Sequence, residues 1–131
     1  MAARDSDYSA FMWAPANEGL DRWLDIYLAV TRRNGAEANA GRHLLAWAHA
    51  AGLTDVRYTT STWTFSTPDE RRWWSDVWAE RVVSSSLAEQ AVAYGVATKT
   101  ELVDIADAWR LWATDPAAVL AVIHGEIIAR V

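Results

Sequence analysis

The chain has 131 residues, of which 52% are hydrophobic and 22% charged, and these values fit one globular domain better than a membrane, collagenous or disordered protein. The formal charge of -5 leaves no surplus of positive charge for a general nucleic-acid binder. The absence of cysteine excludes a disulfide scaffold, a thiolate nucleophile and any cysteine-ligated metal centre.

The first 18 residues show neither a helical nor a strand period. They predict an extended lead-in or loop, with at most a short strand at residues 1–4. The N-terminus lacks the apolar core of a signal peptide, and no apolar run reaches the roughly 18 residues of a membrane helix. We therefore expect a cytoplasmic protein with no membrane partner.

Two helices and a strand are predicted next. Apolar residues at helical spacing indicate a helix over about 19–34, followed by Gly35. Asn39 can cap a second helix that ends at Gly52. Residues 55–65 are rich in β-branched and aromatic side chains, which is typical of a strand.

A capping box at Thr67-Pro68-Asp69-Glu70 predicts the start of a third helix. This helix weakens at serines 84–86 and continues as a shorter helix that ends at Gly95. Thr98 and Glu101 repeat the capping pattern and open a further helix that stops before Pro116.

The last segment, 119–131, is apolar at both alternating sets of positions, as expected of a strand in the centre of a sheet. The chain offers few other strands to flank it. An uncovered apolar edge recruits another chain. The sequence therefore predicts a homo-oligomer, most simply a dimer, that forms through the open edge of strand 119–131.

Five strings stand out along the chain: Arg4-Asp5-Ser6-Asp7-Tyr8, Ala50-Ala51-Gly52-Leu53, Thr67-Pro68, Trp73-Trp74 and His124-Gly125-Glu126-Ile127. In this order they resemble the C-terminal part of class I S-adenosylmethionine-dependent methyltransferases of the ubiquinone/menaquinone-biosynthesis type. The resemblance covers nearly the whole chain, but its strings are typical of a subfamily and not of a chemistry.

The resemblance implies a single α+β domain with part of the Rossmann-like methyltransferase fold. It implies an antiparallel hairpin of strands 55–65 and 119–131, with about five helices, and a helical insertion over 67–116 that covers the substrate pocket. Residues 1–3 would end the fifth strand of the complete fold. The last strand would then lie between the fifth and sixth strands.

The cofactor-binding part of such enzymes is missing from this sequence. S-adenosylmethionine is held by a glycine-rich turn after a strand, and the six glycines here never form a G-x-G pattern. The resemblance thus implies a substrate-side part that does not bind S-adenosylmethionine alone. Whether the chain is itself an enzyme stays open at this point.

His124 is the candidate catalytic residue, as a general base or a substrate hydrogen-bond partner. A histidine packed in the core would fit the same apolar strand. Asp5 and Asp7 follow a presumed strand and would orient a substrate, or would only start a turn. Arg4 would bind an acidic substrate or pair with either acid.

His43 and His49 are spaced too far round their helix to share a metal ion, and no metal site is expected.

Aromatic residues are the remaining candidates for substrate binding. Tyr8, Trp63, Trp73 and Trp78 would line a pocket for a flat acceptor. Aromatic residues at helical spacing also form cores, and Trp73, on the opposite side of its helix from Val77, is the clearest exception to that interpretation.

Three functions follow as hypotheses. The first is a methyltransferase-family polypeptide that binds a small, possibly aromatic methyl acceptor. The second is a non-catalytic fragment that forms a homodimer or docks on a separate cofactor-binding chain. The third is a small-ligand binding module that uses the tryptophan-rich helices.

Overall fold

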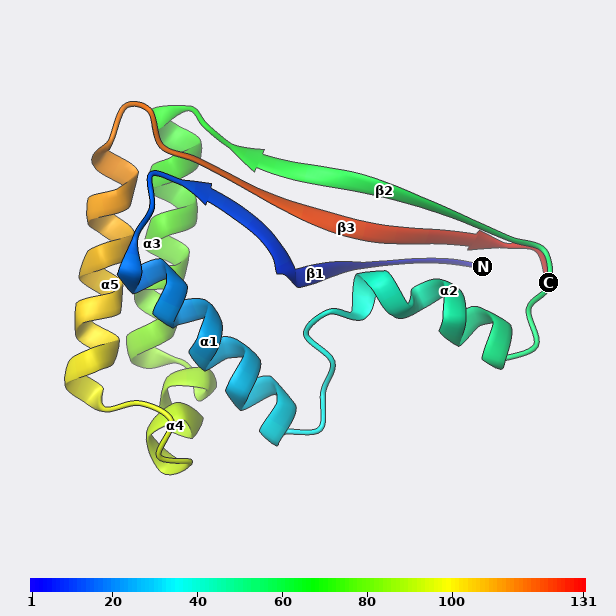
Figure 1. Cartoon of the computed structure of the whole chain (residues 1–131), viewed down its shortest axis with the longest axis horizontal. Coiled ribbons are helices and arrows are strands. Elements are labelled where there is room, and N and C mark those ends of the chain that lie inside the picture. The colour runs from blue at the N-terminus through cyan, green and yellow to red at the C-terminus, as the bar shows by residue number, and fades with distance from the viewer. The chain divides into compact units, whose positions relative to one another are not determined.

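The computed structural model describes all 131 residues as an α+β chain, as predicted (Figure 1). Its elements in order are β1 (Ala2–Ala14), α1 (Glu18–Arg33), α2 (Ala40–Ala50), β2 (Val56–Phe65), α3 (Pro68–Ser84), α4 (Ser86–Ala93), α5 (Lys99–Thr114) and β3 (Val119–Ala129). None of the helices combines the length and the apolar character that a membrane span needs.

The chain divides into two compact units, which we describe separately. The sheet unit contains residues 1–12, 37–64 and 121–131. The helical unit contains residues 13–36 and 65–120, so the whole of the predicted insertion, 67–116, belongs to it together with α1.

The three strands form one sheet in the order β1-β3-β2, and β3 runs opposite to both neighbours (Figure 1). The prediction of a central last strand that pairs antiparallel with residues 55–65 is confirmed. The predicted dimer contact through an open edge of 119–131 is wrong, because β1 and β2 occupy both edges of β3. The outer edges of the sheet belong to β1 and β2 instead.

Strand β1 spans 13 residues where the sequence predicted a loop with a short strand at 1–4. Its aspartates and serines disfavour strands by intrinsic propensity. The backbone of β3 supplies the missing stabilisation: the Ala129 N–H donates to the Met1 carbonyl at 2.8 Å. Pairing with a strand over 100 residues away in the chain thus overrides the local preference.

Helix α2 covers one face of the sheet at very short range. A Cβ atom on Gly125 would lie 2.0 Å from the Gly41 carbonyl oxygen, and one on Gly41 would lie 2.6 Å from the Asp5 carbonyl oxygen. The two glycines therefore let helix and sheet backbones touch. The Tyr58 hydroxyl donates to the same Gly41 carbonyl at 3.0 Å.

Behind this crossing lies the small core of the sheet unit. It contains Leu44 and Ala48 of α2 and Ile127 of β3, with Ala3 and Val56 packed around them. Residues 3, 56, 58, 125 and 127 thus all face α2.

Asn39 precedes α2 but does not cap it as the sequence predicted. Its side chain makes no hydrogen bond to an amide of the helix and instead accepts one from the Ser9 N–H of β1 at 2.9 Å.

The core of the helical unit is built from indole rings in edge-to-face contact. The centroid of Trp23 in α1 lies 4.7 Å from that of Trp78 in α3 and 5.0 Å from that of Trp109 in α5. Trp112 extends this row, and its Nε1 donates to the Ala14 carbonyl at 3.1 Å. Such contacts add to the area that the rings bury.

The helix ends follow the predicted signals closely. Thr67 forms the full capping box with Glu70. The Thr98 hydroxyl accepts from the Glu101 N–H, but the Glu101 carboxylate turns to Arg22 of α1, with 2.6 Å between Nε and Oε1. Thr98 thus forms only half of the box that its sequence predicts.

Candidate functional site

Five side chains gather on the sheet face opposite α2, and we call them the sheet-face cluster. Neighbouring residues of a strand alternate between faces. Because Gly125 and Ile127 face α2, His124 and Glu126 face the other way. The same alternation places Arg4 of β1 and Ser61 and Trp63 of β2 on that face. The cluster is therefore Arg4, Ser61, Trp63, His124 and Glu126.

Glu126 is the polar centre of the sheet-face cluster. Its Oε1 accepts a bond from the Arg4 Nη1 at 3.3 Å and another from the Ser61 hydroxyl. The bond from Ser61 and then the Arg4 guanidinium lower the pKa of Glu126, so its side chain is a carboxylate at neutral pH.

Trp63 and His124 form the aromatic half of the cluster. Their ring centroids are 4.4 Å apart with an interplanar angle of 37°. The Arg4 guanidinium carbon lies 5.9 Å from the centroid of the Trp63 ring, within cation–π range. Trp63 is 44% exposed, so one aromatic surface stays available to a ligand.

His124 is uncharged at neutral pH. Burial is the main cause that lowers its pKa, and the positive charge of Arg4 lowers it further. The Val122 backbone and the acids Asp5 and Glu126 offset part of this effect. The side chain is 6% exposed, and Nδ1 is buried without a hydrogen bond of normal geometry. A neutral imidazole keeps one nitrogen that can accept a proton or a hydrogen bond.

An open hollow of about 400 Å³ adjoins the cluster at the end of the strands. Arg4 and Glu126 belong to both the hollow and the cluster, and Ala2 and Ile128 add apolar surface to the hollow on the same face. This volume lies within the usual range for small-molecule sites.

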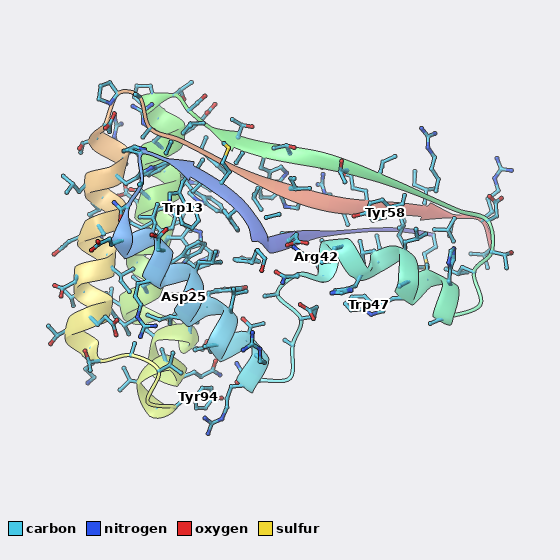
Figure 2. The ribbon with its side chains drawn as sticks, in the orientation of Figure 1. Trp13, Asp25, Arg42, Trp47, Tyr58 and Tyr94 are labelled. Atoms are coloured by element: carbon cyan, nitrogen blue, oxygen red, sulfur yellow. The ribbon has the colours of Figure 1, made fainter.

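The other predicted residues of β1 have different partners. Asp7 is buried and accepts two bonds from Arg42 of α2, one of them 2.7 Å long, so it joins β1 to α2 (Figure 2). The same contact raises the pKa of Arg42. Asp5 accepts from the Ser6 N–H, and Tyr8 packs on Phe11 at 5.2 Å between centroids. Arg4 pairs with neither acid.

The two predicted tryptophans of α3 belong to the helical unit. Trp78 is 2% exposed and forms part of the indole core, so it offers almost no surface to a ligand. Trp73 is 59% exposed and lies near Phe65, with 6.2 Å between centroids. Of the predicted site residues, the structure thus brings together Arg4, Trp63 and His124.

Ser61 and Glu126 were not among the residues singled out from the sequence. The signal was present, because Glu126 follows His124 by two positions and Ser61 precedes Trp63 by two. No three metal-ligating side chains gather anywhere in the chain. His43 instead stacks on Trp47, with 5.7 Å between ring centroids.

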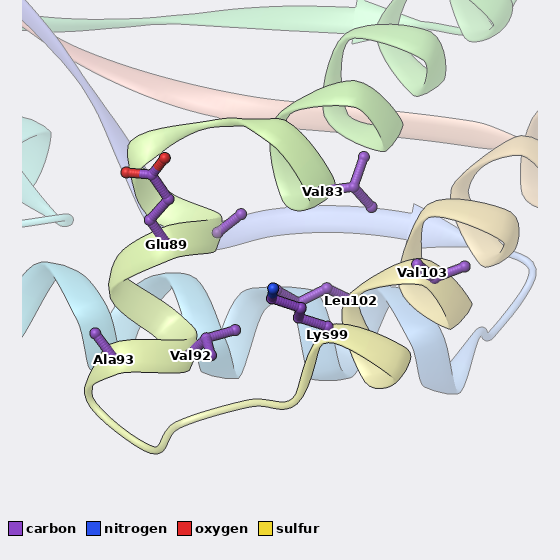
Figure 3. Close-up of a pocket in the computed structure, with 8 residues that line it drawn as sticks. Val83, Glu89, Val92, Ala93, Lys99, Leu102 and Val103 are labelled. Carbon is purple, nitrogen blue, oxygen red and sulfur yellow. The ribbon is translucent and has the colours of Figure 1, made fainter.

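The helical unit contains a larger hollow of about 530 Å³ between α4, α5 and the end of α3 (Figure 3). Its walls are mainly aliphatic, from Val83, Val92, Leu102 and Val103, with Glu89 and Lys99 as its charged residues. No tryptophan lines it, so it is not the aromatic pocket that the sequence predicted for these helices.

No protein-family model matches the chain, and a search of the curated proteins finds no match. The interpretation of the sheet-face cluster therefore depends on the residues of the chain and their arrangement.

Proposed function

We propose that this chain is the substrate-binding part of a class I S-adenosylmethionine-dependent methyltransferase and that it binds a small aromatic acceptor. The observation that carries the proposal is the strand order β1-β3-β2, with an antiparallel last strand in the middle. The methyltransferase resemblance implies this order for its fifth, seventh and sixth strands. The helical segment 67–116 between β2 and β3 supports the same assignment.

The chain does not supply a site for S-adenosylmethionine. Its glycines with positive φ, Gly35, Gly52 and Gly95, all follow helices, whereas the cofactor requires a glycine-rich turn after a strand. The backbones of Gly41 and Gly125 pack against each other, so neither glycine offers free backbone to a cofactor. The residues present thus do not fit the cofactor, and the role of this chain is limited to the acceptor.

Each member of the sheet-face cluster has a property suited to an aromatic acceptor. The half-exposed Trp63 offers a face for ring stacking. The neutral His124 beside it is able to accept a hydrogen bond or proton from a hydroxyl group of the acceptor. Arg4 and Glu126 at the adjoining hollow provide a donor and an acceptor for polar substituents. Holding an acceptor in one orientation is the main contribution that such a part makes to methyl transfer.

Tryptophan fluorescence tests this proposal directly. We expect hydroxylated naphthalenes and phenols to quench the emission of the chain in a saturable way. Trp63→Phe removes this quenching, whereas the matched variant Trp73→Phe, which replaces the exposed tryptophan of the helical unit, keeps it. Equal quenching in both variants, or none in the wild type, would contradict the proposal.

A second candidate is a non-catalytic chain that pairs with another polypeptide. The observation in its favour is the length of β1, an edge strand of 13 residues. The segment at 38–39 covers this edge only at residues 8 and 9, where the Tyr8 N–H donates to the Ala38 carbonyl and the Ser9 N–H to Asn39. Long open edges favour pairing with a further strand. Light scattering at micromolar concentration tests this candidate, and a single species of 14.6 kDa would contradict it.

A further inference from the structure

A groove of about 430 Å³ lies in the helical unit, between the start of α3 and the end of α5. We call it the arginine groove, because Arg71, Arg72 and Arg110 line it together with Ser75, Asp76 and Thr114. It shares no residue with the sheet-face cluster.

Arg71 is the buried base of the arginine groove. It is 4% exposed, yet no carboxylate pairs with it. Its Nε donates to the Ala113 carbonyl at 3.3 Å and its Nη1 to the Ser66 carbonyl. Buried charges normally have a partner of opposite charge, because desolvation is costly. The two carbonyls hold the guanidinium in place but do not neutralise it, and Nη2 makes no bond within the protein.

The rim of the groove adds two further positive charges. Arg110 on α5 is exposed and has no ion pair. Arg72 on α3 pairs only with the exposed Asp69, at 3.2 Å, and such a surface pair contributes little. Asp76 is the one acid in the lining. The groove is therefore locally positive in a chain whose formal charge is -5.

We propose that the arginine groove binds the phosphate group of a small phosphate monoester. Guanidinium groups bind oxyanions through two parallel hydrogen bonds each, and they keep their charge at all relevant pH values. Three guanidinium groups from two helices, α3 and α5, suit the two negative charges of a phosphate monoester better than the single charge of a carboxylate. This proposal is independent of the proposed acceptor site.

Calorimetric titration of the whole chain with phenyl phosphate tests the proposal, with benzoate as the planar monoanion and the ionic strength held constant. We expect saturable binding of phenyl phosphate and inorganic phosphate, and at least about tenfold weaker binding of benzoate. Benzoate binding as tight as that of phenyl phosphate, or no saturable binding of either phosphate, would overturn the proposal.

Variants locate the binding in the groove. Arg110→Gln weakens phosphate binding about tenfold, since one charge-assisted contact is lost. The matched control is Arg32→Gln, which removes an exposed arginine from α1 of the same unit, outside the groove. It leaves the affinity unchanged. Because Arg71 also joins α3 to α5, Arg110 and not Arg71 is the position to vary. Equal losses of phosphate affinity in the two variants would indicate a general charge effect and would contradict binding in the arginine groove.

Discussion

The charge of a single imidazole illustrates how position determines chemistry in this protein. His124 lies within the apolar strand β3, and burial keeps it neutral next to the carboxylate of Glu126. A neutral imidazole and a carboxylate on one strand face, two residues apart, provide two hydrogen-bond acceptors of different strength. The difference in charge between the neutral His124 and the charged Glu126 makes the pair useful for orienting a polar substrate.

The lowered pKa of His124 predicts how stability depends on pH. The unfolded chain titrates at the ordinary histidine pKa of about 6.5, so below this pH it binds more protons than the folded chain. The free energy of unfolding is therefore highest above that pH and falls as the pH is lowered through it. Urea unfolding at pH 7.5 and about 5.5 should show a larger loss for the wild type than for His124→Gln. The exposed His49→Gln variant should behave like the wild type, and an equal loss in all three proteins would contradict this account.

The contact between Gly125 and Gly41 predicts an unusually severe glycine substitution. A methyl group at position 125 would meet backbone atoms that cannot move away without shifting α2. We expect Gly125→Ala to lower the free energy of unfolding by about 3 kcal/mol. Gly52→Ala, at a positive φ in open space, should cost only about 1 kcal/mol. Chemical denaturation compares the two variants, and an equal cost would argue against the close helix–sheet contact.

At the scale of elements, local signals predicted the helices well. The capping residue Thr67, the glycines at 35, 52 and 95, and the serines near 84 act on their immediate neighbours, so the sequence alone identifies them. Strand β1 was missed because its stability comes from pairing with β3 at the other end of the chain. The central place of β3 was predictable, since its apolar residues occupy both faces.

The two threonine caps predict a difference between helices. Thr67 and Glu70 exchange hydrogen bonds, whereas Thr98 receives one bond and Glu101 binds Arg22. Thr67→Ala should therefore lower the free energy of unfolding by about 1 to 2 kcal/mol, and Thr98→Ala by about half as much. Thermal and urea unfolding measure both values. A larger loss for Thr98→Ala would contradict the assignment of the full box to Thr67.

For the whole molecule, the sequence identified three of the five residues of the sheet-face cluster. Arg4, Trp63 and His124 were predicted, because the resemblance placed their strands beside a pocket. Asp7 was predicted as a substrate ligand but pairs with Arg42, a partner that depends on how α2 crosses β1. Trp78 was predicted in the same role but packs in the indole core, where helical spacing alone does not distinguish a core from a pocket. Contacts between distant segments thus account for what the sequence did not predict.

The most direct test of the central claim is a nuclear magnetic resonance titration of the isotope-labelled chain, first with S-adenosylmethionine and then with a hydroxylated naphthalene. We predict that the naphthalene shifts the Trp63 indole resonance and the backbone amides of Arg4, His124 and Glu126. We predict no specific shifts with S-adenosylmethionine at micromolar concentration, because the chain has no glycine-rich turn after a strand. Tight binding of S-adenosylmethionine, or naphthalene shifts confined to the helical unit, would contradict the assignment of this chain to the acceptor side.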